Sequence, residues 1–334
     1  MDVMQPDAVT PRRLVLRRLS AVAGVAGVAG IVTGLVALIA TQLDVDHNIV
    51  IVLASVAPLL MIAPLIGAVV SGIGRQWIVC AASILVLGLF GWSVSPLYIG
   101  GTGESTSANG PSIRIMQANL MVGAADPESL VAMVREREVD VVTVQELTYQ
   151  EADALKAAGL DEVLSHQFLV PYTDGGGGAG IYSRFPLSNP RSLDGFSPET
   201  LSAELNVGLA QPVTLFAVHP APAYISPPSV WADEQRRLGS YMDKVAGRDN
   251  VIVSGDFNAS YSNKQFRNLL TNGYTSAADQ LGSGLIPTYP TDKRYPAVVG
   301  IDHIITKGAV ATSLERIEIE GSDHHGLIAD ITLS

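Results

Sequence analysis

The sequence contains a single cysteine, Cys80, among its 334 residues. One thiol cannot form an internal disulfide, so a disulfide-stabilised scaffold is excluded. Cys80 lies in an apolar stretch, which leaves every residue after position 100 without a thiol. The absence of thiols from that region is compatible with a location outside the cytoplasm but does not require it.

Charge is also scarce, and the scarcity is local. Charged residues make up 16% and hydrophobic residues 48% of the chain, which is more apolar than an ordinary soluble domain. Three stretches lack Asp, Glu, Lys and Arg entirely, and each exceeds the roughly 20 residues that a helix needs to cross a bilayer. They lie between Arg18 and Asp44, His47 and Arg75, and Arg75 and Glu104. We therefore predict three membrane-spanning helices, over about 19–42, 49–73 and 77–98.

A soluble core or a signal peptide would fit these stretches less well. Buried helices of a soluble protein would carry polar stripes at helical spacing, and none is visible. A cleaved signal peptide has an apolar core of about 7–15 residues, whereas the first stretch is apolar over 19–43. Pro58 and Pro64 fall in the second stretch, where a membrane helix tolerates proline.

The arginines predict the orientation of these helices. Arginines precede the first stretch at positions 12, 13, 17 and 18, and Arg75 lies in the second loop, whereas the first loop carries Asp44 and Asp46. Positively charged flanks stay in the cytoplasm, so residues 1–18 and Arg75 are expected there. An odd number of crossings then places everything after the segment 19–100 outside the cell membrane, in a multi-pass arrangement.

The remainder of the chain predicts one mixed α/β domain. Residues 101–111 are small and polar and are typical of a linker, and 112–334 are enough for one large domain. We expect strands near 113–118, 140–145, 180–183, 213–218, 251–255, 302–306, 315–320 and 326–332. Helices are expected near 127–138, 150–159, 229–246 and 263–271.

Five short polar strings each follow an apolar, strand-like run. They are Gln117-Ala118-Asn119, Gln145-Glu146, Ala217-Val218-His219, Gly255-Asp256-Phe257-Asn258 and Ser322-Asp323-His324. A strand that ends in a carboxylate, an amide or an imidazole places that group at the rim of a sheet, where five such groups can converge on a metal ion and a phosphate. Each string alone could be purely structural, such as a surface glutamate at Glu146, an Asx turn at Asp256 or a structural histidine at His219. Together, in this order, they indicate a phosphoesterase.

This set resembles the endonuclease/exonuclease/phosphatase superfamily, which includes DNase I-like nucleases, inositol phosphatases and bacterial sphingomyelinases. The resemblance covers roughly residues 112–334 and is most specific at Gly-Asp-Phe-Asn (255–258) and Ser-Asp-His (322–324). Gly300-Ile301-Asp302-His303 fits a sixth family position, whereas His325-Gly326 departs from the proline that many members carry there. The resemblance implies a four-layer αββα sandwich.

The same resemblance implies a metal site. Glu146 is expected to be the principal ligand of Mg²⁺ (or Mn²⁺), with Asp323 and Asn119 assisting it. Mg²⁺ prefers oxygen ligands and keeps several waters, so one carboxylate with a few helpers suffices.

The other residues of the set are implied to act on the water and the phosphate. Asp256 is expected to position the attacking water, and Asn258 to donate to a phosphate oxygen. Asp302 is expected to orient His324, which contacts the scissile phosphate or acts as acid or base, while His219 donates from the phosphate side.

Four further features have weaker support. His303 and His325 adjoin site residues, but strand alternation predicts that they point to the opposite face. Gly175–Gly178 suits a mobile loop near the mouth of the proposed site, where the strand ends converge, better than a phosphate-binding turn. Thr288-Tyr289-Pro290 either lines the mouth or caps a loop, and Arg184 is an open candidate for an anion contact.

Basic residues are scarce in the α/β region. Five of the 21 Lys and Arg and four of the 32 Asp and Glu precede residue 101, which leaves a net charge of −12 after it. Nucleases draw much of their affinity from basic surfaces, so this charge disfavours nucleic acid. A small phosphate headgroup on a membrane lipid fits better, because a membrane tether raises the effective concentration of lipid substrates.

A three-span anchor followed by an outward phosphoesterase closely resembles VanJ-type membrane proteins, which are associated with teicoplanin resistance. That resemblance implies that the substrate is undecaprenyl pyrophosphate, the carrier lipid of wall synthesis. An extracytoplasmic phosphodiesterase of the phospholipase C, sphingomyelinase or nuclease type remains open. So does an inactive wall-binding module, although a binder would not need the whole catalytic set.

Overall fold

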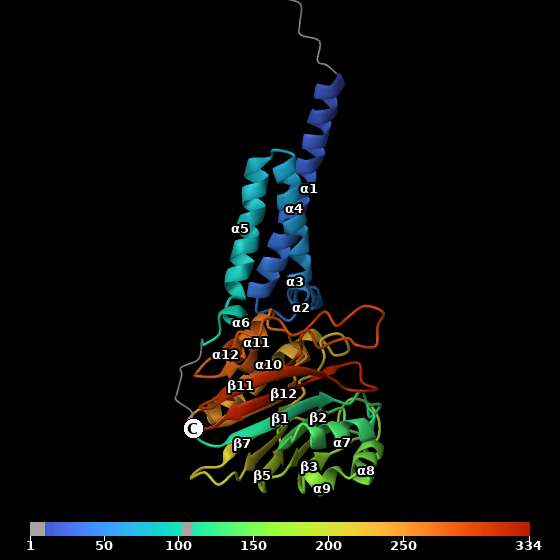
Figure 1. The fold of residues 1–334 in the computed structure, drawn as a ribbon, viewed down its shortest axis with the longest axis vertical. Helices are drawn as coiled ribbons and strands as arrows, with labels where there is room; N and C mark the ends of the chain where they lie inside the picture. Colours follow the sequence, from blue (N-terminus) through green and yellow to red (C-terminus); the bar gives the residue numbers. More distant parts are fainter. Residues whose placement is uncertain (1–10, 102–108) are drawn as a thin grey trace, which may run out of the picture.

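A helical stalk and a larger α/β domain make up the computed structural model, which describes residues 11–101 and 109–334 (Figure 1). The first ten residues of the expected cytoplasmic segment and residues 102–108 of the expected linker lie outside the described residues. The stalk carries the N-terminal third of the chain, and the strands belong to the domain below it in this view.

Three helices of the stalk run side by side, namely α1, α4 and α5 (Figure 1). Small residues allow their backbones to approach closely. A Cβ atom on Gly30 of α1 would lie 2.6 Å from the carbonyl oxygen of Ala63 in α4. The stalk elements are α1 (Pro11–Gln42), α2 (Asn48–Ser55), α3 (Ala57–Leu60), α4 (Ile62–Ile73), α5 (Trp77–Ser93) and α6 (Pro96–Ile99).

The expectation of three full membrane spans was wrong. Within the described residues, one unbroken helical segment, Arg17–Gln42, is long and apolar enough to cross a membrane. The second expected span is bent by 68° between Ser55 and Ala57, because Pro58 lacks an N–H and its ring clashes with the carbonyl four residues earlier. The third expected span is a helix of 17 residues that ends at Ser93, shortly before Pro96. Length and composition therefore do not support a multi-pass membrane location.

The α/β domain contains two six-stranded sheets. The first has the order β11-β12-β1-β2-β4-β3 and the second the order β5-β6-β7-β8-β10-β9. Each has one parallel pair near its centre, β1 with β2 and β7 with β8, and the other pairings are antiparallel. The first sheet comprises β1 (Ser112–Asn119), β2 (Val141–Gln145), β3 (His166–Val170), β4 (Ala179–Ser183), β11 (Val310–Glu318) and β12 (His325–Thr332). The second comprises β5 (Leu187–Ser192), β6 (Leu201–Leu205), β7 (Val213–Val218), β8 (Val251–Asp256), β9 (Thr275–Ser276) and β10 (Asp302–Lys307).

The sheets pack face to face, and helices cover both outer faces. Alternation along β1 sends Ile113 and Ile115 into the core between the sheets and Met116 and Ala118 into the core under the outer helices. The first sheet is covered by α7 (Pro127–Glu136), α8 (Tyr149–Ala157) and α9 (Leu160–Val163). The second is covered by α10 (Pro228–Lys244) and α11 (Lys264–Leu269), and α12 (Ala277–Leu281) lies beside α6. This helix–sheet–sheet–helix order is the mixed α/β two-sheet sandwich that the family resemblance implied.

The stalk and the domain share one apolar core. Ile51 and Phe90 of the stalk belong to the same buried cluster as Trp231 and Leu238 of α10. Polar contacts reinforce the junction: Asn263 Nδ2 donates to the Ile51 carbonyl at 3.1 Å, and the side chain of Arg267 donates to the Thr41 carbonyl. The α/β domain is therefore held against the foot of the stalk.

Candidate active site

The polar strings meet where the central strands end. Asn119 closes β1, Glu146 follows β2, His219 follows β7 and Asp256 closes β8, while Asp302 begins β10 and His324 precedes β12. Glycine is required just before one of them, because a Cβ atom on Gly255 would lie 2.1 Å from the Val218 carbonyl oxygen. The parallel pairing of β7 and β8 therefore brings His219 next to Asp256.

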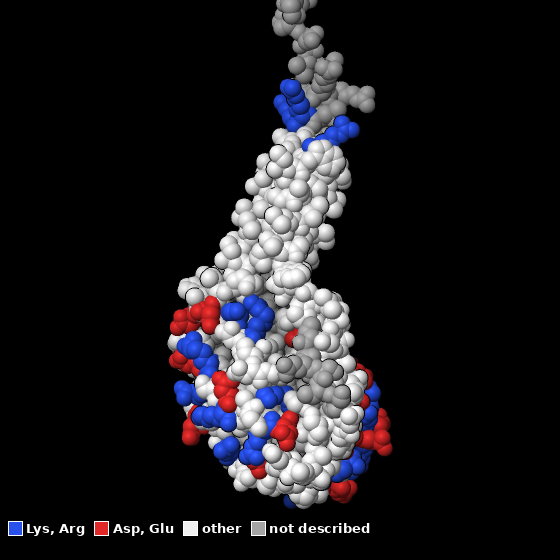
Figure 2. All heavy atoms as spheres, turned by 90° about the vertical axis from the view of Figure 1, so that its left-hand side faces the viewer, with Lys and Arg blue, Asp and Glu red and all other residues white. Residues whose placement is uncertain are grey.

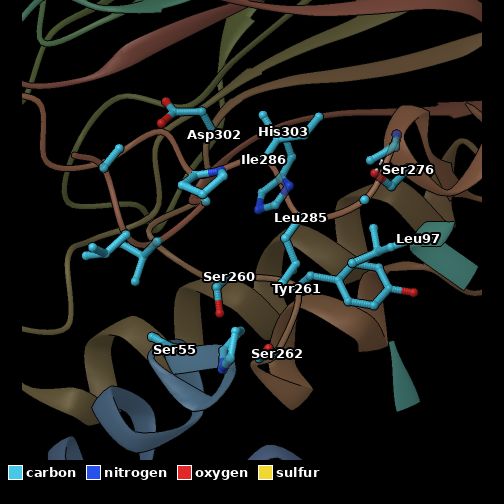
Figure 3. A pocket seen from close by; sticks show the side chains of 18 of the residues that line it. Ser55, Leu97, Ser260, Tyr261, Ser262, Ser276, Leu285, Ile286, Asp302 and His303 are labelled. Carbon is cyan, nitrogen blue, oxygen red and sulfur yellow. Dashed lines mark hydrogen bonds between the residues drawn. The ribbon is translucent and has the colours of Figure 1, made fainter. Parts of the chain in front are cut away.

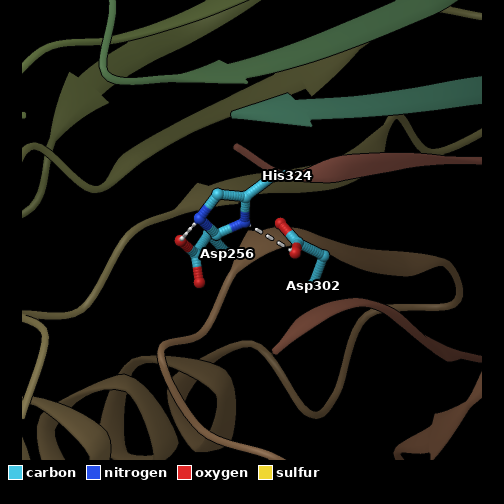
Figure 4. Close-up of side chains that lie close together, drawn as sticks. All are labelled: Asp256, Asp302 and His324. Atoms are coloured by element: carbon cyan, nitrogen blue, oxygen red, sulfur yellow. Dashed lines mark hydrogen bonds and ion pairs between the residues drawn. The ribbon is translucent and has the colours of Figure 1, made fainter. Parts of the chain in front are cut away.

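A buried Asp302–His324 pair forms the centre of the site (Figure 4). Nδ1 of His324 lies 2.9 Å from Oδ2 of Asp302, and Gln117 Nε2 donates to the other oxygen of Asp302 at 2.7 Å. A carboxylate only accepts hydrogen bonds, so Nδ1 carries the proton. Nε2 of His324 then faces Asp256 Oδ2 at 3.8 Å.

The two histidines differ in their protonation. Burial alone would lower the pKa of His324, but the charges of Asp302 and Asp256 raise it to about 10. Burial, together with His324, lowers the pKa of His219 to about 4. Because His219 Nε2 lies 3.7 Å from the same Asp256 oxygen, one carboxylate stands between an imidazolium and a neutral imidazole near neutral pH.

Asn119 connects Asp256 to Glu146. Its Nδ2 donates to Glu146 Oε1 and to Asp256 Oδ2, both at 3.1 Å, and the Val122 N–H donates to the second Glu146 oxygen at 2.8 Å. Glu146 and Val122 have φ values of 59° and 55°, which are strained for residues with a Cβ, especially a β-branched one. The fold holds this carboxylate in place at the cost of local backbone strain.

The amide of Asn258 makes hydrogen bonds within the protein. Its N–H donates to Asp256 Oδ1 at 2.8 Å, which is an Asx turn, and its Nδ2 donates to the Pro220 carbonyl at 2.9 Å. Its carbonyl accepts from Trp231 Nε1 at 2.8 Å. In the structure Asn258 fixes the turn after β8 and ties it to the loop that follows His219.

The carboxylates of the site suit a hard divalent cation. In the part of the chain that the structure describes, no Lys or Arg pairs with Glu146, Asp256, Asp302 or Asp323. Burial and then the charge of Asp302 raise the pKa of Asp256 to about 7. Burial also raises the pKa of Asp323, with a contribution from Glu146. His324 offsets part of the charge of Asp256 and Asp302, and a cation with oxygen ligands would offset the charge of Glu146 and Asp323.

The residues that the structure groups around a possible metal ion differ from the metal ligands predicted from the sequence. The atoms of Asp256, Asp302 and His324 lie within 4.8 Å of one another and could hold an ion. The sequence predicted Glu146, Asp323 and Asn119 as the ligands, and none of these three belongs to that group. The Glu146–Asn119–Asp256 contacts nevertheless place both sets in one mouth.

Some neighbours of the site had no predicted role. Gln117 donates to Gln145 Oε1 at 2.8 Å as well as to Asp302, so both glutamines support the central pair. The Tyr289 ring lies 4.7 Å from that of His324, and Tyr224 stacks on Tyr289 at 6.5 Å. The Thr288 hydroxyl accepts from the Asp302 N–H. The 288–290 segment therefore borders the mouth, whereas no sequence pattern identified Tyr224.

Of the remaining candidates, two lie away from the site and one lies beside it. His303 Nε2 lies 3.0 Å from the Ala259 carbonyl, and its ring packs 4.0 Å from Phe266, away from the site as expected. Arg184 pairs with Asp140, which precedes β2 at the end opposite the site. Gly176 lies beside Glu146, because a Cβ atom there would be 3.1 Å from the carboxyl carbon.

Two exposed apolar side chains of the described domain, Val122 and Tyr224, lie beside residues of the site. Val122 neighbours Glu146, and Tyr224 stacks on Tyr289. The large hydrophobic side chains exposed in the described residues after 109 are Val122, Tyr149, Tyr172, Tyr224, Ile225 and Tyr295.

The model of the Endonuclease/Exonuclease/phosphatase family matches residues 116–324, and the chain belongs to this family. Members of this family are usually metal-dependent phosphoester hydrolases. No curated protein matches the sequence.

Solved structures with the same fold have very different sequences. D. rerio TDP2 complexed with a single-strand DNA product has a TM-score of 0.54 at 19% identity, over 66% of this chain and 98% of that chain. An endonuclease/exonuclease/phosphatase family protein from Bacteroides thetaiotaomicron has a TM-score of 0.53 at 15% identity, over 67% and 98%. The mannosyl-6-phosphatase Bt3783 of the same organism has a TM-score of 0.50 at 14% identity, over 66% and 99%. At these identities the likeness concerns the fold alone.

Proposed function

We propose that the protein is a membrane-anchored, divalent-metal-dependent phosphoesterase that hydrolyses undecaprenyl pyrophosphate outside the cell membrane. The observation that carries the proposal is the attachment of the phosphoesterase-family domain and its site to an apolar helical stalk, with which it shares a buried core. In Figure 2 the charged side chains gather on the domain and at the far end of the stalk, and the stalk surface between them is uncharged.

The stalk supports anchoring through α1. The apolar segment Arg17–Gln42 has 26 residues, which span about 39 Å as a helix and exceed a hydrocarbon core of about 30 Å. Arg17 and Arg18 are exposed at its N-terminal end. Positive charge remains in the cytoplasm, so the domain at the opposite end of α1 faces outward.

The proposed mechanism is direct attack of water on phosphorus. Glu146 and Asp323, with Asn119, would hold Mg²⁺ or Mn²⁺, which supplies Lewis-acid polarisation of a phosphoryl oxygen. Asp256, placed between the two imidazoles, positions the water and accepts its proton. Nε2 of His324 donates to the charge that develops on the phosphoryl oxygens, and Asp302 keeps that nitrogen directed at it.

The other residues of the site bind the phosphate, hold the turn that carries Asp256 or exclude water. His219, neutral near pH 7, contacts the phosphate through Nε2, and Asn258 holds the turn that carries Asp256. Tyr224 and Tyr289 shield the imidazole of His324 from water. A pyrophosphate already carries a phosphate leaving group, so neutralising its charge lowers the barrier without a separate strong acid.

Charge and location favour a lipid over a polyanion. The net charge of −12 after residue 101 repels a nucleic-acid backbone, and the mouth lies on the domain that packs against the stalk. The resemblance to VanJ-type proteins, which now rests on an apolar anchor followed by a phosphoesterase domain rather than on three spans, adds undecaprenyl pyrophosphate as the specific lipid and a role in teicoplanin resistance through altered carrier-lipid cycling. Cells that express the wild type should tolerate more teicoplanin than cells that express His324→Ala.

A selectivity panel tests the proposal. Purified full-length protein in detergent with Mg²⁺ would receive undecaprenyl pyrophosphate, sphingomyelin, phosphatidylcholine and single-stranded DNA in parallel. The proposal expects the pyrophosphate to be turned over fastest, with release of inorganic phosphate. Faster cleavage of DNA, or turnover of the phosphodiester lipids alone, would replace it with a phosphodiesterase function.

A further inference from the structure

We propose that a cavity between the stalk and the α/β domain binds the first isoprene units of the substrate's hydrocarbon chain, an inference that rests on the proposed function. The cavity has a volume of about 340 Å³. Figure 3 shows it between Ser55 at the foot of the stalk and Asp302 of the catalytic centre. Its walls come from the α2–α3 bend, from Leu97, from β10 and from the loop between α12 and β10.

The lining suits an apolar ligand. Leu285, Ile286, Val298 and Val299 supply much of the wall, and no Lys or Arg contributes to it. Most of the polar atoms in the cavity wall already have hydrogen-bond partners within the protein. For example, Ser55 Oγ lies 2.9 Å from both the Ile51 carbonyl and Asn263 Oδ1, and His303 Nε2 contacts the Ala259 carbonyl. Polar ligands would find few free partners here, whereas a hydrocarbon needs none.

The position of the cavity fits a chain that comes from the bilayer. Pro58 and Leu59 form part of its wall at the bend between α2 and α4, and Leu59 is 42% exposed. At the other end the wall includes Asp302, whose carboxylate holds His324. The loop over 282–301 lines the cavity and also carries Tyr289 against His324. One loop therefore borders both the apolar cavity and the catalytic mouth.

The volume sets how much of the chain can enter. At about 30 Å³ for each water-sized group, 340 Å³ holds on the order of ten carbon groups, which is about two isoprene units. The rest of a long polyprenyl chain would stay in the bilayer beside the stalk. Affinity should therefore rise with chain length over the first units and then level off.

Chain length provides the test, because isopentenyl, farnesyl and undecaprenyl pyrophosphate share one headgroup. KM for phosphate release by the full-length protein should be at least about tenfold lower for farnesyl than for isopentenyl pyrophosphate, since each buried methylene contributes roughly fourfold to affinity. The change from farnesyl to undecaprenyl pyrophosphate should be smaller. Equal KM values for all three would overturn the cavity while leaving the proposed function intact.

Filling the cavity tests the site itself. Leu59→Trp and Ala297→Trp add bulk at two walls, and Ile62→Trp adds the same ring on the exposed side of α4, outside the cavity. The two cavity variants should raise KM for farnesyl pyrophosphate about tenfold and change kcat/KM for isopentenyl pyrophosphate much less, because a single isoprene unit fills only about half of the cavity. The activity that remains toward isopentenyl pyrophosphate also shows that the variants fold. The control should match the wild type for both substrates.

The outcomes separate the two claims. A wild type that hydrolyses none of the three pyrophosphates would overturn the proposed function. A wild type that hydrolyses them all, with KM values insensitive to both cavity variants, would overturn the cavity alone. A bound phospholipid that occupies the cavity without regard to the substrate would give that second result.

Discussion

Replacing Asp302 by asparagine should disable His324 while leaving the fold intact. Asp302 is buried, and both of its oxygens accept hydrogen bonds, one from Gln117 and the other from His324 Nδ1. In Asp302→Asn the new carbonyl must face Gln117, because Gln117 offers an N–H there. The new amide N–H then faces Nδ1 and favours the tautomer with its proton on the wrong nitrogen.

The expected loss follows from that geometry. In serine proteases the same change behind a catalytic imidazole lowers kcat by about 10⁴. Here the metal ligands and His219 remain, so we expect kcat to fall by about 10²–10³, which is about 3–4 kcal/mol of transition-state stabilisation. Burial alone would lower the pKa of His324, and Asp302 is the largest contributor that raises it. Removing that charge should lower the pKa and move the alkaline limb of the pH–rate profile to lower pH.

The assay is phosphate release from undecaprenyl pyrophosphate across a pH series, with the thermal midpoint of each protein measured in parallel. Asp330→Asn is the matched control, because Asp330 pairs with Arg114 at the half-exposed end of β12, outside the site. Its effect on kcat should be negligible. If Asp302→Asn kept most of its activity with an unchanged pH profile, the assignment of Asp302 as the residue that orients His324 would be refuted.

Three further predictions concern the metal, stability and topology. Glu146→Gln should lower kcat by about 10²–10³ and raise the Mg²⁺ concentration for half-activity; normal activity at low Mg²⁺ would exclude Glu146 as a ligand. Burial raises the pKa of Glu151 to about 7, so its favourable contribution is complete below its unfolded pKa and is lost as pH rises through about 7. Glu151→Gln should therefore raise the free energy of unfolding by about 2 kcal/mol at pH 8 and hardly change it at pH 4; equal effects at both would contradict this. In a Cys80→Ser background, a membrane-impermeant thiol reagent on intact cells should label a cysteine at Asn109 but not one at Arg18, which lies at the N-terminal end of the apolar segment Arg17–Gln42; the reverse pattern would invert the orientation.

The sequence predicted the strands that the core buries on both faces. Strands β2, β7 and β8 are mostly apolar runs and β1 has apolar residues between polar ones, and each of the four was expected within about two residues of its observed bounds. Strands β3, β5, β6 and the two-residue β9 were missed. β5 lies at the edge of its sheet, is mostly exposed and contains Pro190, so it lacks the alternation that identifies a strand.

The stalk illustrates a limit of composition. Apolar stretches of adequate length predicted three spans, but hydropathy does not report where a helix bends or stops. Pro58 breaks the second stretch near Val56, and the chain turns after Ser93 to pack Leu97 against the domain. Tertiary contacts with the domain thus shape these helices as much as their own residues do.

For the site, strand-end strings identified the residues that converge, because the end of a strand fixes where its last side chain lies. The residues that hold these side chains in place were harder to predict from the sequence. Gln117 shares a face with Ile113 and Ile115, toward the second sheet, and reaches Asp302 only because the two sheets stack. Tyr224 lies in an irregular loop whose position depends on the turn at Asn258 and Pro220, and no local pattern predicts that.

The proposed function is tested most directly by the rate at which purified wild-type protein releases phosphate from undecaprenyl pyrophosphate. The rate is measured with Mg²⁺, with a chelator and for His324→Ala. A metal-dependent hydrolase of this lipid should turn it over only with the metal present, and its rate should fall by about 10²–10³ when the imidazole is removed. Turnover that persists with the chelator and in His324→Ala, or no release of phosphate from this lipid under any of the three conditions, would contradict the proposed function.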